Sequence, residues 1–220
     1  MTVEIHPQIE QHIRELGGAM ELRPGFYETL LKEPTDWAFL VQLQVVVEAA
    51  IAQRVVKALK QDKAFDHVSR LPFDGKAGKL QLALSLGVLD SGSADALRAL
   101  AACRNRFAYR LANIGATLEK FGESLDEPTK LDLLRKMGAL EPVDEGAEQD
   151  AGFSGFGAAL RHRLWLATAV ALARMVDVRI HTQLVDLQRE LERSRREHLN
   201  PSRPAARTLL DFYAKNTEGS

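Results

Sequence analysis

A long apolar stretch between residues 37 and 60 constrains the fold of this 220-residue chain more than any other feature. Its apolar residues occupy most faces of the helix that their spacing predicts. Because a helix that is apolar on most faces is buried on several sides, the stretch predicts the central helix of a core. Val45-Val46-Val47 alone would suit a strand, but the length of the run favours a helix. The apolar residues of the stretch are Phe39, Leu40, Val41, Leu43, Val45, Val46, Val47, Ile51, Val55, Val56 and Leu59.

Helical spacing runs through most of the remaining sequence, and the alternation typical of strands is nearly absent. The fold class is therefore predicted to be all-α. Thr35 or Asp36 can cap the central helix, since either side chain can accept a bond from a free N–H group of the first turn. Short helices are expected over residues 8–16, ended by Gly17-Gly18, and over residues 26–32.

Glycines are expected to end two later helices, over residues 76–86 and 126–137. Gly87 and Gly138 follow these helices and can take the left-handed backbone of a C-cap. Between the two helices, Ser93 can cap a further one that carries the single cysteine of the chain. These signals predict several short helices around the central one.

The chain is predicted to have three parts. Residues 1–140 form a helical core, and residues 141–157, which are acidic and glycine-containing, form a flexible linker. Residues 158–220 form an arm with a long helix over about 158–198 and a short terminal helix. At 1.5 Å per residue the long helix would measure roughly 60 Å, more than a small domain. Part of it is therefore expected to pair with another helix or another subunit, and a homodimer is predicted.

Composition excludes some classes of protein. A net charge of −1 and 45% hydrophobic residues describe a soluble globular protein with no overall attraction to nucleic acid or membrane. The N-terminus lacks the features of a signal peptide. The apolar run of residues 164–173 is shorter than the roughly 20 residues that span a bilayer. The single cysteine, Cys103, fits a cytoplasmic protein, and its apolar neighbours predict a buried, inert thiol.

The segment Arg104-Asn105-Arg106-Phe107-Ala108-Tyr109 is the candidate site. The guanidinium of Arg104 can hold a phosphate through paired hydrogen bonds, and Asn105 can orient neighbouring groups. Tyr109 has an ordinary pKa of about 10, so making it a base at pH 7 costs about 4 kcal/mol. The alternative is structural: Arg104 and Asn105 cap helices and pair with a buried acid such as Glu48, while the rings of the segment pack.

Together with Phe73-Asp74-Gly75 and Lys79-Leu80-x-Leu-Ala83-x-x-Leu86-Gly87, this segment resembles the mannitol operon repressor family. The resemblance covers roughly residues 35–120. It implies an all-helical, HEPN-like bundle, to which this chain adds the long C-terminal arm. The family's usual pattern is Arg-Asn-x-Phe-Ala-His, and in catalytic HEPN domains the arginine and histidine cleave RNA. Here Tyr109 stands where the histidine is expected.

The sequence favours a non-catalytic regulatory or interaction protein that resembles mannitol operon repressors, acts in transcriptional regulation and binds an unidentified protein partner. The alternative is a metal-independent ribonuclease, with RNA as the partner, in which Arg104 holds phosphate and Tyr109 replaces the histidine. A third class is a nucleic-acid binder that uses the arginine-rich C-terminal arm, although acidic residues are interleaved there. No histidine or cysteine spacing predicts a metal site, and no cofactor or membrane partner is expected.

Overall fold

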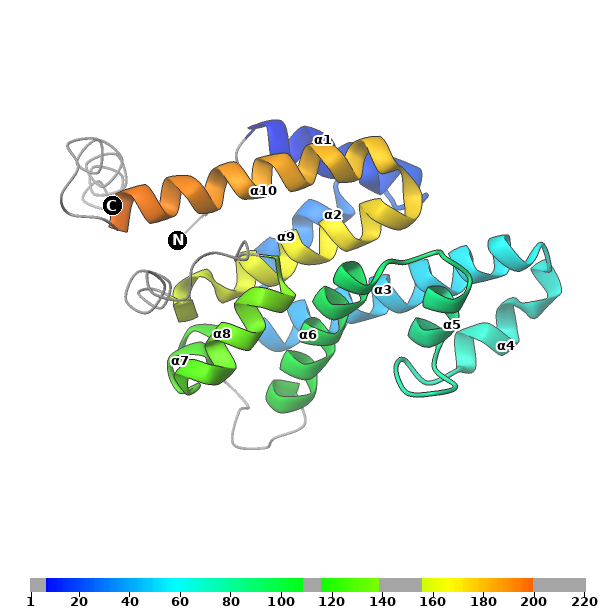
Figure 1. The fold of residues 1–220 in the computed structure, drawn as a ribbon, viewed down its shortest axis with the longest axis horizontal. Helices are drawn as coiled ribbons and strands as arrows, with labels where there is room; N and C mark the ends of the chain where they lie inside the picture. Colours follow the sequence, from blue (N-terminus) through cyan, green and yellow to red (C-terminus); the bar gives the residue numbers. More distant parts are fainter. Residues whose placement is uncertain (1–6, 109–115, 139–155, 200–220) are drawn as a thin grey trace.

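The computed structural model describes residues 7–108, 116–138 and 156–199 (Figure 1). These residues form helices and no strand, which confirms the all-α prediction. In chain order the helices are α1 (Pro7–Ala19), α2 (Phe26–Thr29), η1 (Leu30–Lys32), α3 (Asp36–Leu59), η2 (Asp62–Ala64), α4 (Phe65–Arg70), α5 (Lys79–Ser85), α6 (Ser91–Ala108), α7 (Leu118–Glu123), α8 (Glu127–Lys136), α9 (Phe156–Val176) and α10 (Val178–Leu199).

The central helix α3 lies where the sequence predicted it. The side chain of Thr35 caps it by accepting a hydrogen bond from the Ala38 N–H. Helices α4, α5, α6 and α9 all pack against α3. By length and composition α3 could cross a membrane, but 61% of its most apolar 18-residue window is buried inside the bundle. That burial is what a core helix requires.

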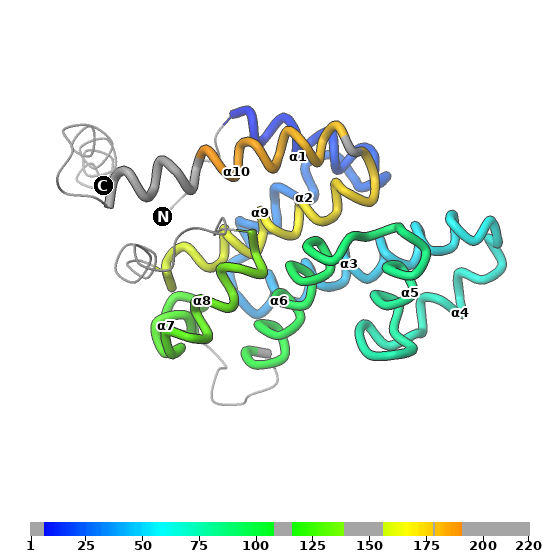
Figure 2. The backbone as a smooth tube through the Cα atoms, viewed as in Figure 1, coloured from blue at the N-terminus to red at the C-terminus, as the bar shows by residue number. Residues whose placement is uncertain are grey.

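The predicted long helix over residues 158–198 is wrong, because the chain breaks at Asp177 into α9 and α10. Asp177 ends the first helix and caps the second: its Oδ1 accepts a hydrogen bond from the Arg179 N–H at 2.8 Å. Helix α10 then folds back and packs on α9 and α1 (Figure 2). A side-chain cap inside a run of helix-forming residues therefore replaces one long rod with a hairpin.

Helix α9 belongs to the core of the bundle. It packs on α3, α6 and α7, and its apolar side chains join one buried cluster with those helices. The apolar face of α9 is thus covered by the chain itself, so it does not support the predicted homodimer, which stays a prediction. The buried residues of this face are Leu160, Leu164, Ala167, Ala171 and Met175.

The predicted linker, residues 141–157, lies mostly outside the described residues. Its last two residues, Phe156 and Gly157, are the buried first residues of α9. A Cβ atom on Gly157 would lie 2.2 Å from the Glu119 carbonyl oxygen of α7, and one on Gly122 would lie 2.8 Å from the Gly157 Cα. These two glycines let the backbones of α7 and α9 touch, so Gly157 is a packing residue rather than a linker residue.

The predicted helix ends are partly right. Gly87 and Gly138 both have a φ of 67°, the left-handed backbone expected of C-caps. Helix α1, however, continues through Gly17-Gly18 to Ala19. Helix α6 begins at Ser91, and Asp90 rather than Ser93 supplies the cap, since Asp90 Oδ1 accepts a hydrogen bond from the Ser93 N–H at 2.7 Å.

Candidate functional site

Arg104 lies near the C-terminal end of α6, and Arg104-Asn105-Arg106-Phe107-Ala108 completes that helix. Its side chain is 18% exposed, whereas Asn105 is exposed and Phe107 is buried. Tyr109, the candidate proton-transfer residue, lies outside the described residues. The described part of the candidate site is thus the end of one helix, with Arg104 turned toward the bundle.

The structure brings Arg104 together with Glu48 of α3. The Arg104 Nη2 atom lies 3.9 Å from Glu48 Oε1, an ion-pair distance too long for a hydrogen bond. The same oxygen accepts a hydrogen bond of 3.1 Å from Gln44 Nε2. Glu48 Oε2 accepts one of 2.9 Å from the Lys79 ammonium. Both carboxylate oxygens of Glu48 are therefore engaged by side chains from three helices, α3, α5 and α6.

Lys79 is the residue of this cluster that sequence reasoning missed. It is the first residue of α5, its side chain is 2% exposed, and it also donates a hydrogen bond of 3.0 Å to the Ser69 carbonyl. Lysine is almost never fully buried unless it is paired, and a cation at a helix N-terminus opposes the helix dipole. No local signal could have identified it, because the helix was expected to begin at Lys76 and a lysine near a helix start is ordinary until its burial is known.

The loop before α5 fixes the position of Lys79. The Lys79 N–H donates to the Pro72 carbonyl at 2.8 Å, so the loop satisfies a free N–H group of the first turn. A Cβ atom on Gly78 would lie 2.6 Å from the Asp74 carbonyl carbon, so the turn accepts only glycine there. The loop therefore fixes the first residue of α5 and places the Lys79 side chain beside Glu48.

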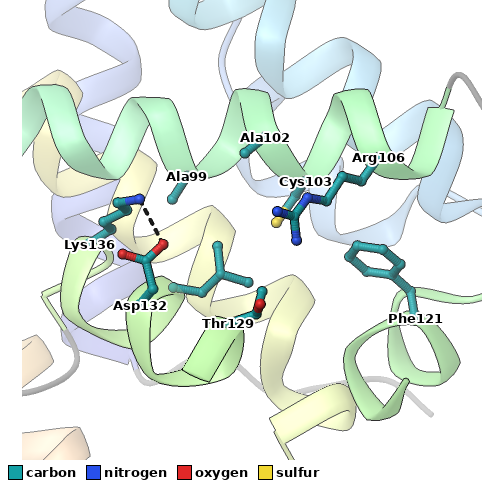
Figure 3. A pocket seen from close by; sticks show the side chains of 9 residues that line it. Ala99, Ala102, Cys103, Arg106, Phe121, Thr129, Asp132 and Lys136 are labelled. Atoms are coloured by element: carbon teal, nitrogen blue, oxygen red, sulfur yellow. Dashed lines mark hydrogen bonds and ion pairs between the residues drawn. The ribbon is translucent and has the colours of Figure 1, made fainter. Parts of the chain in front are cut away.

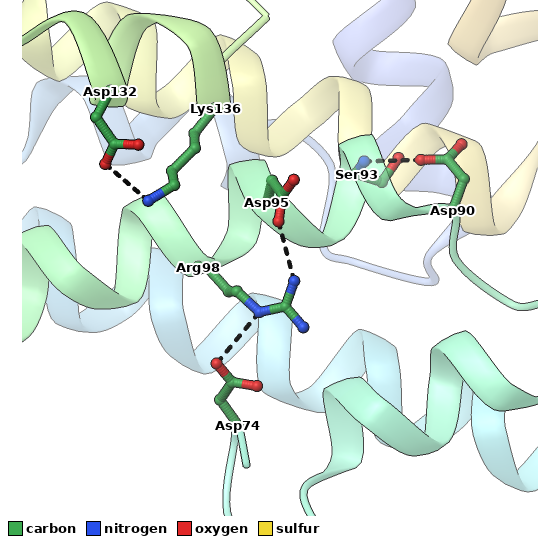
Figure 4. A network of polar contacts seen from close by, with 7 residues as sticks. All are labelled: Asp74, Asp90, Ser93, Asp95, Arg98, Asp132 and Lys136. Carbon is green, nitrogen blue, oxygen red and sulfur yellow. Dashed lines mark hydrogen bonds and ion pairs between the residues drawn. The ribbon is translucent and has the colours of Figure 1, made fainter. Parts of the chain in front are cut away.

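A second polar network braces this loop against α6 (Figure 4). Arg98 of α6 lies between two acids: its Nε is 3.3 Å from Asp74 Oδ2 and its Nη1 is 3.0 Å from Asp95 Oδ1. The side chains are about one-third to one-half exposed, and pairs of that exposure contribute little to stability. The network orients the loop more than it stabilises the fold.

At the start of α6, Asp90 joins that helix to α9. Besides the Ser93 N–H, it binds Arg174, whose Nε lies 3.0 Å from Asp90 Oδ2. Burial raises the pKa of Asp90, but the hydrogen bonds from Ser93 and Arg174 and the charge of Arg174 outweigh burial. The pKa of this carboxyl therefore lies below its ordinary value of 3.8.

A small pocket of about 90 Å³ opens between α6, α7 and α8, beside the candidate site (Figure 3). Cys103 lines it together with Arg106, Phe121 and Leu133. Burial raises the pKa of the Cys103 thiol to about 12, and the charge of Arg106 opposes this only in part. The thiol is thus buried and protonated at neutral pH, as predicted, and offers no nucleophile.

Several arginines of the predicted basic arm are ion-paired inside the chain. Arg161 shows this best: its Nη1 lies 2.9 Å from Asp36 Oδ1, and its Nη2 donates to the carbonyls of Leu30 and Glu33. Such pairing reduces the charge available to a phosphate backbone. The other pairs in the described residues include Arg174–Asp90, Arg179–Glu15 and Arg189–Asp186.

Within the described ranges, no three His, Cys, Asp or Glu side chains are grouped closely enough to hold a metal ion. Compared with known proteins, the chain matches no protein-family model, no curated protein and no solved structure. The functional interpretation therefore depends on the Glu48–Lys79–Arg104 cluster and the surfaces around it.

Proposed function

We propose that this chain is a non-catalytic regulatory or interaction protein that acts through a protein partner. One observation carries the proposal: Arg104, the cation that a ribonuclease would use, is paired with Glu48, and Glu48 is fixed by the buried Lys79. The arginine thus belongs to a structural cluster that joins three helices.

The charge of Glu48 also opposes phosphate binding at Arg104. A phosphate that approached the guanidinium would meet a carboxylate 3.9 Å away. Glu48 could not turn away without breaking its hydrogen bond to Lys79, a side chain that is 2% exposed. Leaving that ammonium unpaired in the core would be strongly unfavourable. The cluster therefore favours a structural Arg104 over one that holds a phosphate.

The kind of regulation rests on the resemblance described above. Similarity to mannitol operon repressors suggests transcriptional regulation in the cytoplasm through contact with another protein. The alternative proposal, a metal-independent ribonuclease, draws on the same resemblance and requires Arg104 and Tyr109 to act on RNA together. Tyr109 is a poor proton acceptor at neutral pH, which favours the first proposal.

An RNA cleavage assay tests the choice. The parent protein and its Arg104→Ala, Tyr109→Phe and Tyr109→His variants are incubated with a mixed single-stranded RNA pool and a chelator. We expect no cleavage by the parent. Cleavage by the parent that is lost in both Arg104→Ala and Tyr109→Phe would overturn the proposal and establish the ribonuclease.

Stability measurements on the same variants test the structural role of Arg104. We expect Arg104→Ala to lower the free energy of unfolding by about 1 kcal/mol, because it removes an ion pair from a partly buried carboxylate that keeps its hydrogen bonds to Lys79 and Gln44. Arg135→Ala is the matched control, since Arg135 is an exposed arginine in the last turn of α8; we expect a change within about 0.5 kcal/mol. Equal stability of both variants would contradict a structural Arg104.

A further inference from the structure

The loop before α5 contains the only Asp-Gly dipeptide of the chain, Asp74-Gly75. An aspartate followed by glycine is prone to a rearrangement of the main chain, because the glycine nitrogen can attack the aspartate carboxyl group with no side chain in its way. Both residues are exposed, so water has access to them. The sequence therefore supplies a reactive pair, and the fold decides whether the pair can react.

The fold leaves both reacting groups of this dipeptide accessible. Among the described residues, the Gly75 N–H group donates no hydrogen bond. The Asp74 side chain is 45% exposed, and its ion pair is the contact of Oδ2 with the Arg98 Nε atom at 3.3 Å (Figure 4). Gly75 has a φ of 98°, which only glycine adopts freely. The turn thus requires the very residue that makes Asp74 reactive.

Asp90-Ser91 provides a comparison within the same chain, because serine is also a small residue. Both carboxylate oxygens of Asp90 are bound: Oδ1 accepts a hydrogen bond from the Ser93 N–H at 2.7 Å, and Oδ2 lies 3.0 Å from the Arg174 Nε atom. Attack by the next main-chain nitrogen would require this carboxyl group to turn and would break the cap of α6. The fold therefore protects Asp90, whereas Asp74 has no such cap to lose.

We propose that Asp74 is a site of isoaspartate formation in the folded protein. The Gly75 nitrogen attacks the Cγ atom of the protonated Asp74 carboxyl group, and the carboxyl OH leaves with the amide proton as water, which closes a succinimide ring. Water then adds to one ring carbonyl and breaks its bond to nitrogen. Opening at Cγ restores aspartate. Opening at the main-chain carbonyl gives isoaspartate, in which the chain runs through Cβ and Cγ and the α-carboxylate becomes the side group.

Isoaspartate would lengthen the main chain inside a closely packed turn. The N–H groups of the first two residues of α5 donate to the carbonyls of Pro72 and Phe73 at 2.8 and 3.0 Å. A Cβ atom on Gly78 would lie 2.6 Å from the Asp74 carbonyl carbon, so the two main chains are in contact. An extra main-chain carbon at Asp74 displaces these contacts and, with them, the Lys79 ammonium. The modification should therefore loosen α5 and lower stability, independently of the proposed function.

Incubation in water enriched in the heavy oxygen isotope measures the reaction, because each ring opening adds one oxygen atom from water. The full chain is kept folded at mildly acidic pH and physiological temperature, beside a sample in guanidinium chloride. Digestion with trypsin in ordinary water then releases Asp74 in peptide 71–76 and Asp90 in peptide 80–98. We expect Asp74 to gain heavy oxygen and isoaspartate in the folded sample, as shown by mass spectrometry and chromatography, and Asp90 to gain them only in the denatured one.

Variants test the role of the surrounding residues. Arg98→Ala should speed the reaction, because it frees the Asp74 carboxyl group, whereas the exposed control Arg135→Ala should leave the rate unchanged. Asp74→Glu keeps the charge but would have to close a larger ring, so it should gain no heavy oxygen at this position. The Tm of the parent should fall on incubation, and that of Asp74→Glu should not. Circular dichroism checks that the fresh variants are folded.

Three outcomes would overturn the inference. Heavy oxygen gained at Asp74 only in the denatured sample would show that the fold protects the dipeptide. Equal gain at Asp74 and Asp90 in the folded sample would show that the structure does not distinguish the two sites. Isoaspartate at Asp74 with an unchanged Tm would refute the predicted effect on α5. None of these results bears on RNA cleavage, so they leave the proposed function to its own test.

Discussion

Replacing Lys79 with methionine should destabilise the fold far more than a typical lysine substitution. The side chain is 2% exposed, and its ammonium bonds Glu48 Oε2 at 2.9 Å and the Ser69 carbonyl at 3.0 Å. Methionine fills a similar volume but donates nothing, so the change removes both bonds and leaves the two acceptors behind.

The expected loss follows from these contacts. A hydrogen bond to a charged group is worth about 1.5–3 kcal/mol, and two are lost. Glu48 is 31% exposed and keeps Gln44 and Arg104, so part of the loss is recovered by water and by the remaining partners. We therefore expect Lys79→Met to lower the free energy of unfolding by about 2–3 kcal/mol, equivalent to about 4–12 °C in Tm for a chain of this size.

A double-mutant cycle measures the coupling free energy between Lys79 and Glu48. Glu48→Gln alone should cost about 2–4 kcal/mol, because it leaves a buried ammonium without a carboxylate. The double variant should cost clearly less than the sum, with a coupling of about 1–3 kcal/mol between the two residues. Urea unfolding followed by circular dichroism supplies the values, and exposed Lys57→Met is the control. Additive effects within about 0.5 kcal/mol would refute this account of the cluster.

Three further predictions concern other parts of the molecule. Gly157→Ala should destabilise the fold by about 1–3 kcal/mol or more, because its new side chain would be overpacked against α7. Gly17→Ala, which has open space around it in α1, should be neutral or stabilising by up to about 1 kcal/mol. Thermal unfolding of the two variants measures the difference. Cys103, with a pKa of about 12, should react with a thiol reagent at pH 8 only as fast as the fold opens; rapid labelling of the native protein would contradict this. Because folding lowers the pKa of Asp90, its contribution to the free energy of unfolding is complete above its ordinary pKa of 3.8 and is lost as the pH falls through the folded value. Asp90→Asn should therefore lower the free energy of unfolding by about 0.5 kcal/mol at pH 7 and by less below pH 3, as measured by urea unfolding at each pH.

Helix ends decided by local chemistry were predictable from the sequence. Thr35 needs only the N–H groups of the next turn to act as a cap, and it does so. Gly87 and Gly138 follow apolar helices at positions where the backbone turns left-handed, and both have that conformation. No distant part of the chain is required for any of these contacts.

Features that depend on distant contacts were not predictable in the same way. Gly157 resembles a linker glycine by composition, and only the passage of α7 across α9 makes its missing side chain necessary. Gly17-Gly18 would end an isolated helix, but Ile13 and Leu16 are buried beside them, and packing carries α1 through to Ala19. Tertiary packing overrides local preference at these positions.

In the candidate site, too, some residues could be predicted from the local sequence and others depend on distant packing. Arg104 stood out because its segment is unusual, and Glu48 because it is the only acid between residues 37 and 60, so their meeting could be anticipated. Lys79 had no such contrast, because lysine at a helix start is ordinary until burial is known. The Lys79 side chain is 2% exposed because the loop before α5 places this helix against α3. No local sequence pattern predicts that contact.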